Sequence, residues 1–152
     1  MKPLHLRHLT EGERALAREV FGDGIRLQRV RLLSLPWWGR AFVPGAGLIV
    51  WPAAEAMDDF SAAPLHVQAA LVHELVHVWQ AQHGTWLPWA KIRAGDKAGS
   101  YAYDLDRQPD FAALNIEQQA MVIEDAFAAS RGGSAPYPAE RYAEASAAWR
   151  RT

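Results

Sequence analysis

Apolar residues are closely spaced through residues 64–83, which makes this segment the clearest element of the chain. At about 100° per residue, its apolar side chains cover most of the circumference of a helix. They are Leu71, Val72, Leu75, Val76, Val78 and Trp79. Pro64 suits the first turn of a helix, and Gly84 suits the position just past its end. Because a helix that is apolar nearly all round is buried, we expect residues 64–83 to form a buried helix.

One narrow stripe of this helix is polar, and it carries His66, His73, Glu74, His77 and Gln80. Residues 73–77 read HELVH, the HExxH pattern in which two histidines one turn apart bind one ion and the glutamate reaches a water on it. Two hydrogen-bonded core histidines are the alternative, but a metal would satisfy both imidazoles at once. We therefore predict His73 and His77 as metal ligands and Glu74 as the catalytic carboxylate. His66 is expected to be a structural or cleft-wall residue.

A catalytic zinc site needs a third protein ligand and one open position, and His83 is one choice for that ligand. It completes HELVHVWQAQH, which has the spacing of the metzincin pattern. However, Gln80 stands where that pattern has the glycine that turns the chain back to the metal. Glutamine continues a helix, so we expect His83 to be carried away from the site.

Glu117 is the other choice for the third ligand. Asn115 can cap a helix and Gln118 can complete a capping box, which places Glu117 in the first turn of a second helix. Glu124 lies two turns further on near the same face and is a weaker choice. A solvated glutamate favoured by the helix dipole is the alternative interpretation, so the residues alone leave the third ligand open.

Elsewhere the hydropathy pattern mixes helices and strands and predicts an α+β fold. Residues 10–21 form a helix with a capping box of Thr10 and Glu13 and an end at Gly22. Residues 25–32 have an imperfect period of two, typical of a half-exposed strand.

A hairpin and a last helix complete the pattern. Residues 40–43 and 48–51 flank a Pro-Gly-Ala-Gly turn, which predicts the hairpin. Residues 139–149 predict a final helix that docks by Tyr142 and Trp149.

Residues 84–114 are the least regular stretch, and we expect them to form the lower wall of a cleft. Tyr101 and Tyr103 lie within it, and a phenol can donate a hydrogen bond to the oxyanion that develops during amide hydrolysis. Either tyrosine is therefore a candidate catalytic residue. A packing role is the alternative for both.

Composition narrows the choice of function. With 152 residues, half of them hydrophobic, the chain suits one domain over residues 1–152. Its net charge of −1 gives no electrostatic case for binding nucleic acid or a membrane. The absence of cysteine excludes thiolate sites, so a metal must take nitrogen and oxygen ligands, as catalytic zinc does. The N-terminus lacks the apolar core of a signal peptide, which predicts synthesis in the cytoplasm. Export by a dedicated secretion machine, which needs no signal peptide, stays possible.

Several segments together resemble a known family. The HELVHVWQ run with a downstream glutamate helix is similar to zincin metallopeptidases of the gluzincin type. Residues 21–33, 40–52, 69–80, 101–105 and 115–127 resemble a bacterial family of Vgr-related metallopeptidases. They are also similar to a zincin-like core domain associated with extracellular contractile injection systems. The resemblance covers about residues 9–127, most of the chain.

This resemblance implies a small α+β zincin-like fold that binds one Zn²⁺ through His73, His77 and Glu117, with Glu74 as the catalytic carboxylate. The resemblance also implies a peptide or protein substrate and a role as a component of a secretion system. By analogy, residues 48–51 form the sheet edge that binds substrate, although an ordinary core strand is an equal alternative.

The chain departs from many gluzincins at Met121, where those proteins have an aspartate that orients a ligand histidine. Asp58, Asp104, Asp125 or a backbone carbonyl could take that part. The alternative function is a non-catalytic, metal-bearing interaction module of a secretion or contractile injection assembly.

Overall fold

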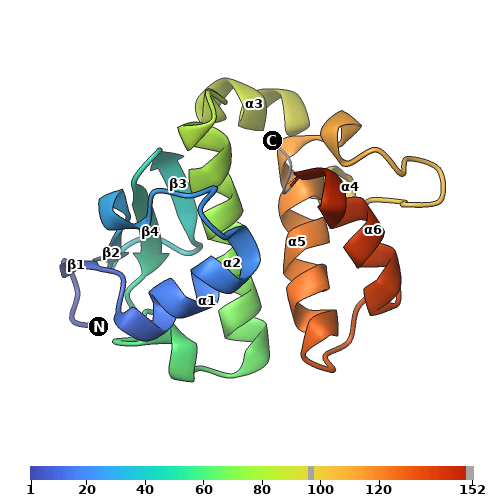
Figure 1. The fold of residues 1–152 in the computed structure, drawn as a ribbon. Helices are drawn as coiled ribbons and strands as arrows, with labels where there is room; N and C mark the ends of the chain where they lie inside the picture. Colours follow the sequence, from blue (N-terminus) through green and yellow to red (C-terminus); the bar gives the residue numbers. More distant parts are fainter. Residues whose placement is uncertain (96–97, 150–152) are drawn as a thin grey trace.

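A four-stranded mixed sheet forms one side of the molecule, and helices form the rest (Figure 1). The computed structural model describes residues 1–95 and 98–149, except for the side chains of residues 98 and 146–149. The strands are β1 (Leu6–His8), β2 (Arg31–Leu35), β3 (Phe42–Gly45) and β4 (Leu48–Pro52). Their order in the sheet is β1-β2-β4-β3, and only β2 and β4 are parallel. The predicted α+β class is confirmed.

Six helices and three short 3₁₀ turns pack beside and across this sheet in the described residues. The helices are α1 (Glu11–Phe21), α2 (Leu65–Gln82), α3 (Leu87–Ala94), α4 (Ala98–Tyr101), α5 (Ile116–Ser130) and α6 (Ala139–Trp149). The 3₁₀ turns are Leu27–Arg29, Phe60–Ala62 and Phe111–Ala113. In Figure 1, α2 runs through the middle of the molecule, with the sheet on one side and α5 on the other.

Helix α1 begins and ends where its sequence predicts. The Thr10 side chain accepts a hydrogen bond from the backbone N–H of Glu13, and the Glu13 side chain accepts one from the backbone of Thr10. This capping box pairs N–H groups that have no partner inside the helix. At the other end, Gly22 has φ of 54°, which an L-residue adopts only with strain. The predicted first helix is confirmed.

Helices α2 and α5 are the pair that positions the polar stripe. Pro64 is the N-cap of α2, and His83 is its C-cap, so the helix has nearly the predicted bounds. The side chain of Asn115 accepts hydrogen bonds from the backbone N–H groups of Glu117 and Gln118, and Gln118 completes the predicted capping box of α5. The apolar side chains of α2, among them Leu71, lie in the core between the sheet and α5.

The hairpin of β3 and β4 is confirmed, but the prediction that residues 48–51 form the free edge of the sheet is wrong. Strand β4 lies between β2 and β3, and most of its residues are buried. The hairpin partner β3 takes the edge position, since it pairs with β4 from Phe42 to Gly45. The core-strand alternative is therefore the one that the structure supports.

Two other predicted segments differ from the structure. Residues 25–29 do not extend the strand: the chain makes a 3₁₀ turn at Leu27–Arg29, and β2 begins only at Arg31. The buried Ile25 and Leu27 are spaced like a strand, but they point into the core from a turn. The stretch 84–114, expected to be irregular, contains α3 and α4.

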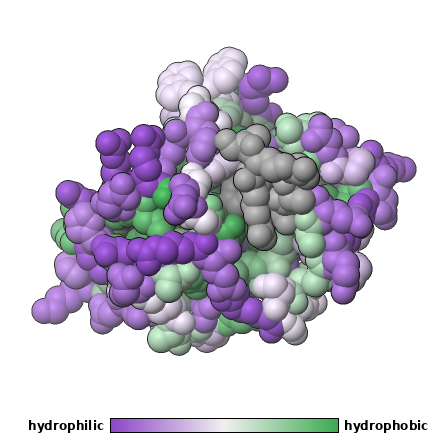
Figure 2. All heavy atoms as spheres, viewed as in Figure 1, coloured by the Kyte–Doolittle hydropathy of each residue, from purple (hydrophilic) through white to green (hydrophobic). Residues whose placement is uncertain are grey.

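The surface of the molecule is largely polar on the face drawn in Figure 2. Figure 2 shows polar and charged side chains over most of the face that it presents. Among the described residues, no helix is both long and apolar enough to cross a bilayer.

Helix α6 is confirmed with its predicted bounds, and its Tyr142 is 1% exposed. The predicted docking of Trp149 concerns a side chain outside those that the structure describes.

Candidate metal centre

The structure brings three residues of the predicted site together on facing helices. His73 and His77 project from α2, and Glu117 projects from the first turn of α5. The Nε2 atoms of the two histidines lie 3.4 Å and 3.1 Å from the same carboxylate oxygen, Glu117 Oε2. One potential ligand atom from each of the three buried residues lies within 4.8 Å of the others. Such a cluster can hold a metal ion.

The other ring nitrogen of each histidine has its own partner. His73 Nδ1 lies 2.9 Å from Glu124 Oε2, and His77 Nδ1 lies 2.8 Å from Gln80 Oε1. Gln80 in turn donates hydrogen bonds through Nε2 to the carbonyl of Ile116 and to the side chain of Gln119. With Nδ1 held by these oxygens, Nε2 is the atom that each histidine can offer to a metal once its proton has been displaced.

These orienting residues were not the ones expected. Asp104 accepts backbone hydrogen bonds within its own turn, Asp125 accepts from Tyr103, and Asp58 is largely exposed. Glu124 takes the orienting role at His73. Its spacing of seven residues from Glu117 already placed it on the same face of the helix. Gln80 was visible in the polar stripe three residues after His77, but only the tertiary structure assigns it a partner.

The imidazole of His73 and the carboxylate of Glu117 shift each other's pKa. Burial alone would lower the pKa of His73, but hydrogen bonds to Glu117 and Glu124 outweigh it and raise the pKa to about 9. Burial would raise the pKa of Glu117, yet its hydrogen bonds to His73 and His77 hold that pKa far below its ordinary value. The site therefore favours a positive charge beside Glu117, which a proton or a metal ion can supply.

Glu74 lies on α2 between the two histidines and is 8% exposed. Its Oε2 is buried and has no hydrogen-bond partner among the described residues. A buried carboxylate oxygen without a donor is costly, and such groups in native proteins mark a function or an absent ligand. This orphaned oxygen and the nitrogen and oxygen donors of the cluster both fit a site for zinc with a bound water.

The two tyrosines lie in different surroundings. The ring of Tyr101 stacks toward that of His73, with centroids 6.4 Å apart. Tyr103 donates its hydroxyl hydrogen bond to Asp125 and also contacts the hydroxyl of Tyr142 on α6. Burial, reinforced by the bond to Asp125, raises the pKa of Tyr103, so its phenol stays protonated. Its hydroxyl thus ties α5 to α6, whereas Tyr101 lies beside the metal cluster.

His83 and His66 lie outside the cluster. The Nδ1 of His83 lies 2.8 Å from the carbonyl of Trp79 in its own helix, and the side chain is exposed. It is not part of the three-residue cluster. His66 lines a cavity of about 750 Å³ together with Trp51 and Ala70. Since Ala70 lies one turn before Glu74 on α2, this cavity adjoins the face that carries the cluster.

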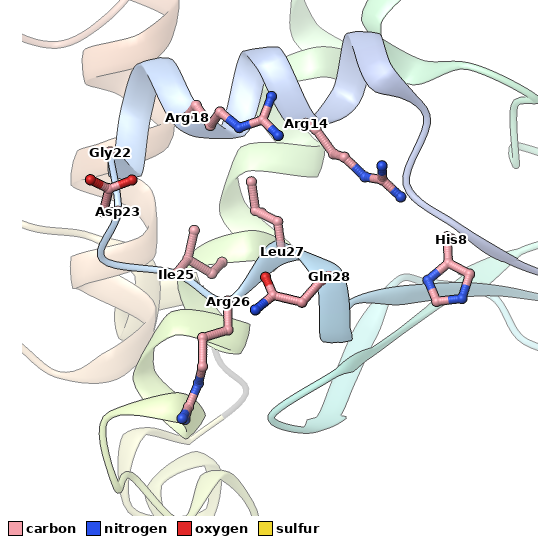
Figure 3. Close-up of a pocket in the computed structure, with 9 residues that line it drawn as sticks. All are labelled: His8, Arg14, Arg18, Gly22, Asp23, Ile25, Arg26, Leu27 and Gln28. Carbon is pink, nitrogen blue, oxygen red and sulfur yellow. The ribbon is translucent and has the colours of Figure 1, made fainter.

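A second cavity, of about 470 Å³, lies between α1 and the segment that follows it (Figure 3). Arg14 and Arg18 reach over it from α1, while Asp23 and Arg26 come from the next segment. Both helix arginines pair with the same carboxylate, Glu11. None of the residues that line this cavity belongs to the metal cluster.

Comparison with known proteins shows the family of this chain. No family model matches the chain. A solved structure, the effector domain of Pseudomonas aeruginosa VgrG2b, is similar over 94% of this chain and 81% of that chain, with a TM-score of 0.69 and 32% identity. The chain belongs to the VgrG2b effector-domain family.

A curated relative carries this domain within a much longer protein. The type VI secretion system spike protein VgrG2b of Pseudomonas aeruginosa is 35% identical over 130 residues. The match covers 80% of this chain but only 13% of the spike protein. The likeness is thus to a small part of the spike protein.

Proposed function

We propose that this protein is a zinc-dependent metallopeptidase of the gluzincin type, with His73, His77 and Glu117 as the metal ligands. One observation carries the proposal. Two Nε2 atoms converge on one oxygen of a buried carboxylate, while Glu124 and Gln80 hold both Nδ1 atoms. Core histidines packed only for stability would not need both ring nitrogens fixed around a common point.

The donor set favours zinc among the common metals. Two imidazoles and one carboxylate match the ligands of catalytic zinc sites, which keep a further position for water. Calcium and magnesium prefer sites made of oxygen alone. Zinc in such a site supplies a water of lowered pKa and a Lewis acid for the scissile carbonyl.

Glu74 would act as the general base. Its Oε2 has no donor in the described structure, so it is available to accept a proton from a water held beside the histidines. The same carboxyl group can then give that proton to the departing amine. The low exposure of Glu74 strengthens its interaction with groups inside the site.

Tyr101 is the better of the two tyrosines for binding the oxyanion. Its ring stacks toward that of His73, with centroids 6.4 Å apart, whereas Tyr103 lies at the contact between α5 and α6. A phenol beside the cluster could donate to a carbonyl oxygen as that oxygen gains charge. The cavity lined by Trp51, His66 and Ala70, nearer the N-terminus of α2, would provide room for a substrate side chain.

We further propose that the protein is an effector delivered by a type VI secretion spike, acting on a peptide or protein substrate. The support is its likeness to the VgrG2b effector domain and to the spike protein of that name.

The decisive test compares wild-type protein with Glu74→Gln on a library of peptides. Zinc should bind both proteins with about one equivalent, while hydrolysis is lost in the variant. Glu140→Gln, at an exposed position on α6, is the matched control and should cleave like the wild type. Hydrolysis that survives Glu74→Gln would disprove the mechanism. Zinc binding without cleavage of any peptide would instead favour a metal-bearing interaction module.

A further inference from the structure

A lysine lies beside the metal cluster. Lys91 belongs to α3, and its Nζ is 3.6 Å from Glu117 Oε1. The side chain of Glu117 is 4% exposed and that of Lys91 is 36% exposed. A cation so close to a proposed metal ligand is unexpected, because it carries the same sign of charge as the metal.

The two oxygens of Glu117 face different partners. Oε2 lies 3.4 Å from His73 Nε2 and 3.1 Å from His77 Nε2. Oε1 lies toward Lys91. The carboxylate is therefore held with one oxygen inside the cluster and the other turned toward an ammonium group.

The fold fixes Lys91 in this place. Leu87 anchors α3 in the core at 2% exposure, and Lys91 follows it by four residues on the same face of the helix. Trp86, Trp89 and Ile92 point outward and are largely exposed. The lysine thus faces the cluster because α3 packs against α5 by its Leu87 side.

We propose that Lys91 keeps Glu117 as a one-oxygen metal ligand and so preserves a coordination position for water. The inference rests on the proposed metal site. A carboxylate can bind a metal through one oxygen or through both, and two-oxygen binding occupies an additional position. Lys91 retains Oε1 by ion pairing, so only Oε2 is offered to the metal.

This arrangement lowers metal affinity while it keeps the site open. An outer partner that accepts from a ligand histidine, as Glu124 does, makes that ligand a better donor. A cation on a ligand carboxylate has the opposite effect, since it draws charge from the ligand and repels the ion. Lys91 is therefore a positioning residue whose removal should tighten metal binding.

The test measures zinc affinity by competition with a chelator, and coordination by the visible absorption of the cobalt(II) protein. Lys91→Met should bind zinc about tenfold more tightly than wild type. Its cobalt bands should weaken, as they do when the coordination number rises. Lys91→Arg should restore the wild-type affinity and spectrum, because it retains a cation beside Oε1. Arg93→Met, an exposed position on the same helix, is the matched control and should behave as wild type.

Each outcome decides the matter. Equal affinity and equal spectra in wild type and Lys91→Met would overturn the proposal, as would weaker binding in the variant. Tighter binding with an unchanged spectrum would also overturn it, because repulsion alone would account for that result. If Lys91→Met does not fold, Lys91→Gln can be measured in its place with the same expected results. Wild-type protein that binds no zinc would refute the proposed function itself, so the two failures are distinct.

Discussion

The carboxylate of Glu124 lies 2.9 Å from Nδ1 of His73, across the interface between α5 and α2. This contact sets the orientation of the imidazole and directs its Nε2 toward Glu117. Many gluzincins place an aspartate four residues after the ligand glutamate for this purpose, and Met121 stands there in this chain. A glutamate one turn further along the helix, with its longer side chain, reaches the same ring nitrogen.

Removing this contact should weaken metal binding. Glu124→Ala frees the His73 ring and removes a negative charge, so we expect zinc affinity to fall by about 10–100-fold. Glu124→Gln, which still accepts a hydrogen bond through its amide oxygen, should lose less. Competition with a chelator measures both variants, and Glu140→Gln on α6 is the control. Unchanged affinity in Glu124→Ala would mean that this contact does not orient the ligand.

Stability of the metal-free protein should depend on the protonation of His73. Burial lowers its pKa, but hydrogen bonds to Glu117 and Glu124 outweigh this and raise it from 6.5 to about 9. A raised pKa stabilises the fold fully below the unfolded value, and the contribution is lost as pH rises through the folded value. The free energy of unfolding should therefore fall between pH 6.5 and pH 9.

Chemical denaturation of metal-free protein across that range measures this decline. His73→Gln should flatten the decline, because the titrating group is gone. Zinc must displace the same proton, so its apparent affinity should rise by about tenfold per pH unit until His73 is deprotonated. A metal-free protein whose stability is flat across the range, with zinc affinity equally flat, would contradict the raised pKa.

The sequence predicts the elements that depend on local signals. Helix α1 and helix α5 follow from the capping boxes at Thr10 and Asn115, whose hydrogen bonds span three residues. The buried α2 follows from its apolar circumference. Strand β1 has three residues and no periodic signal, and it exists only because β2 offers it a partner across the sheet.

In the candidate site too, contacts between residues close in sequence are predictable, whereas contacts between distant residues are not. The spacing of His73, Glu74 and His77 is local, so the pattern predicts their approach to one another. The contacts of Glu124 with His73 and of Lys91 with Glu117 depend on how α5 packs against α2 and α3, and no spacing rule joins residues so distant in sequence. The position of β4 inside the sheet likewise depends on its pairing with both β2 and β3.

A buried ion pair near the start of the chain should matter more for stability than any surface pair. The guanidinium of Arg7 donates two hydrogen bonds, each of 2.7 Å, to the carboxylate of Glu13, which is fully buried. Arg7→Met would leave that charge without its cation, and breaking such a pair costs about 3–5 kcal/mol. Backbone N–H groups of Thr10 and Phe60 also donate to Glu13, so we expect the lower end of that range.

Denaturant unfolding of the Arg7→Met protein measures this loss. Arg18→Met is the control, because Arg18 pairs with the exposed Glu11 and an exposed pair of this kind should add little to stability. Equal effects of the two substitutions would mean that the buried pair adds nothing beyond a surface pair.

Substitutions of Tyr101 and Tyr103 should have different effects. The ring of Tyr101 stacks toward that of His73, and if its hydroxyl binds the oxyanion as proposed, Tyr101→Phe should lower kcat by about a hundredfold. Tyr103→Phe instead removes the donor to the half-buried Asp125 and should destabilise the fold by about 1–3 kcal/mol, with kcat nearly unchanged. Peptide hydrolysis and denaturant unfolding on both variants give the two readings. A kcat that falls in Tyr103→Phe and not in Tyr101→Phe would reverse the assignment.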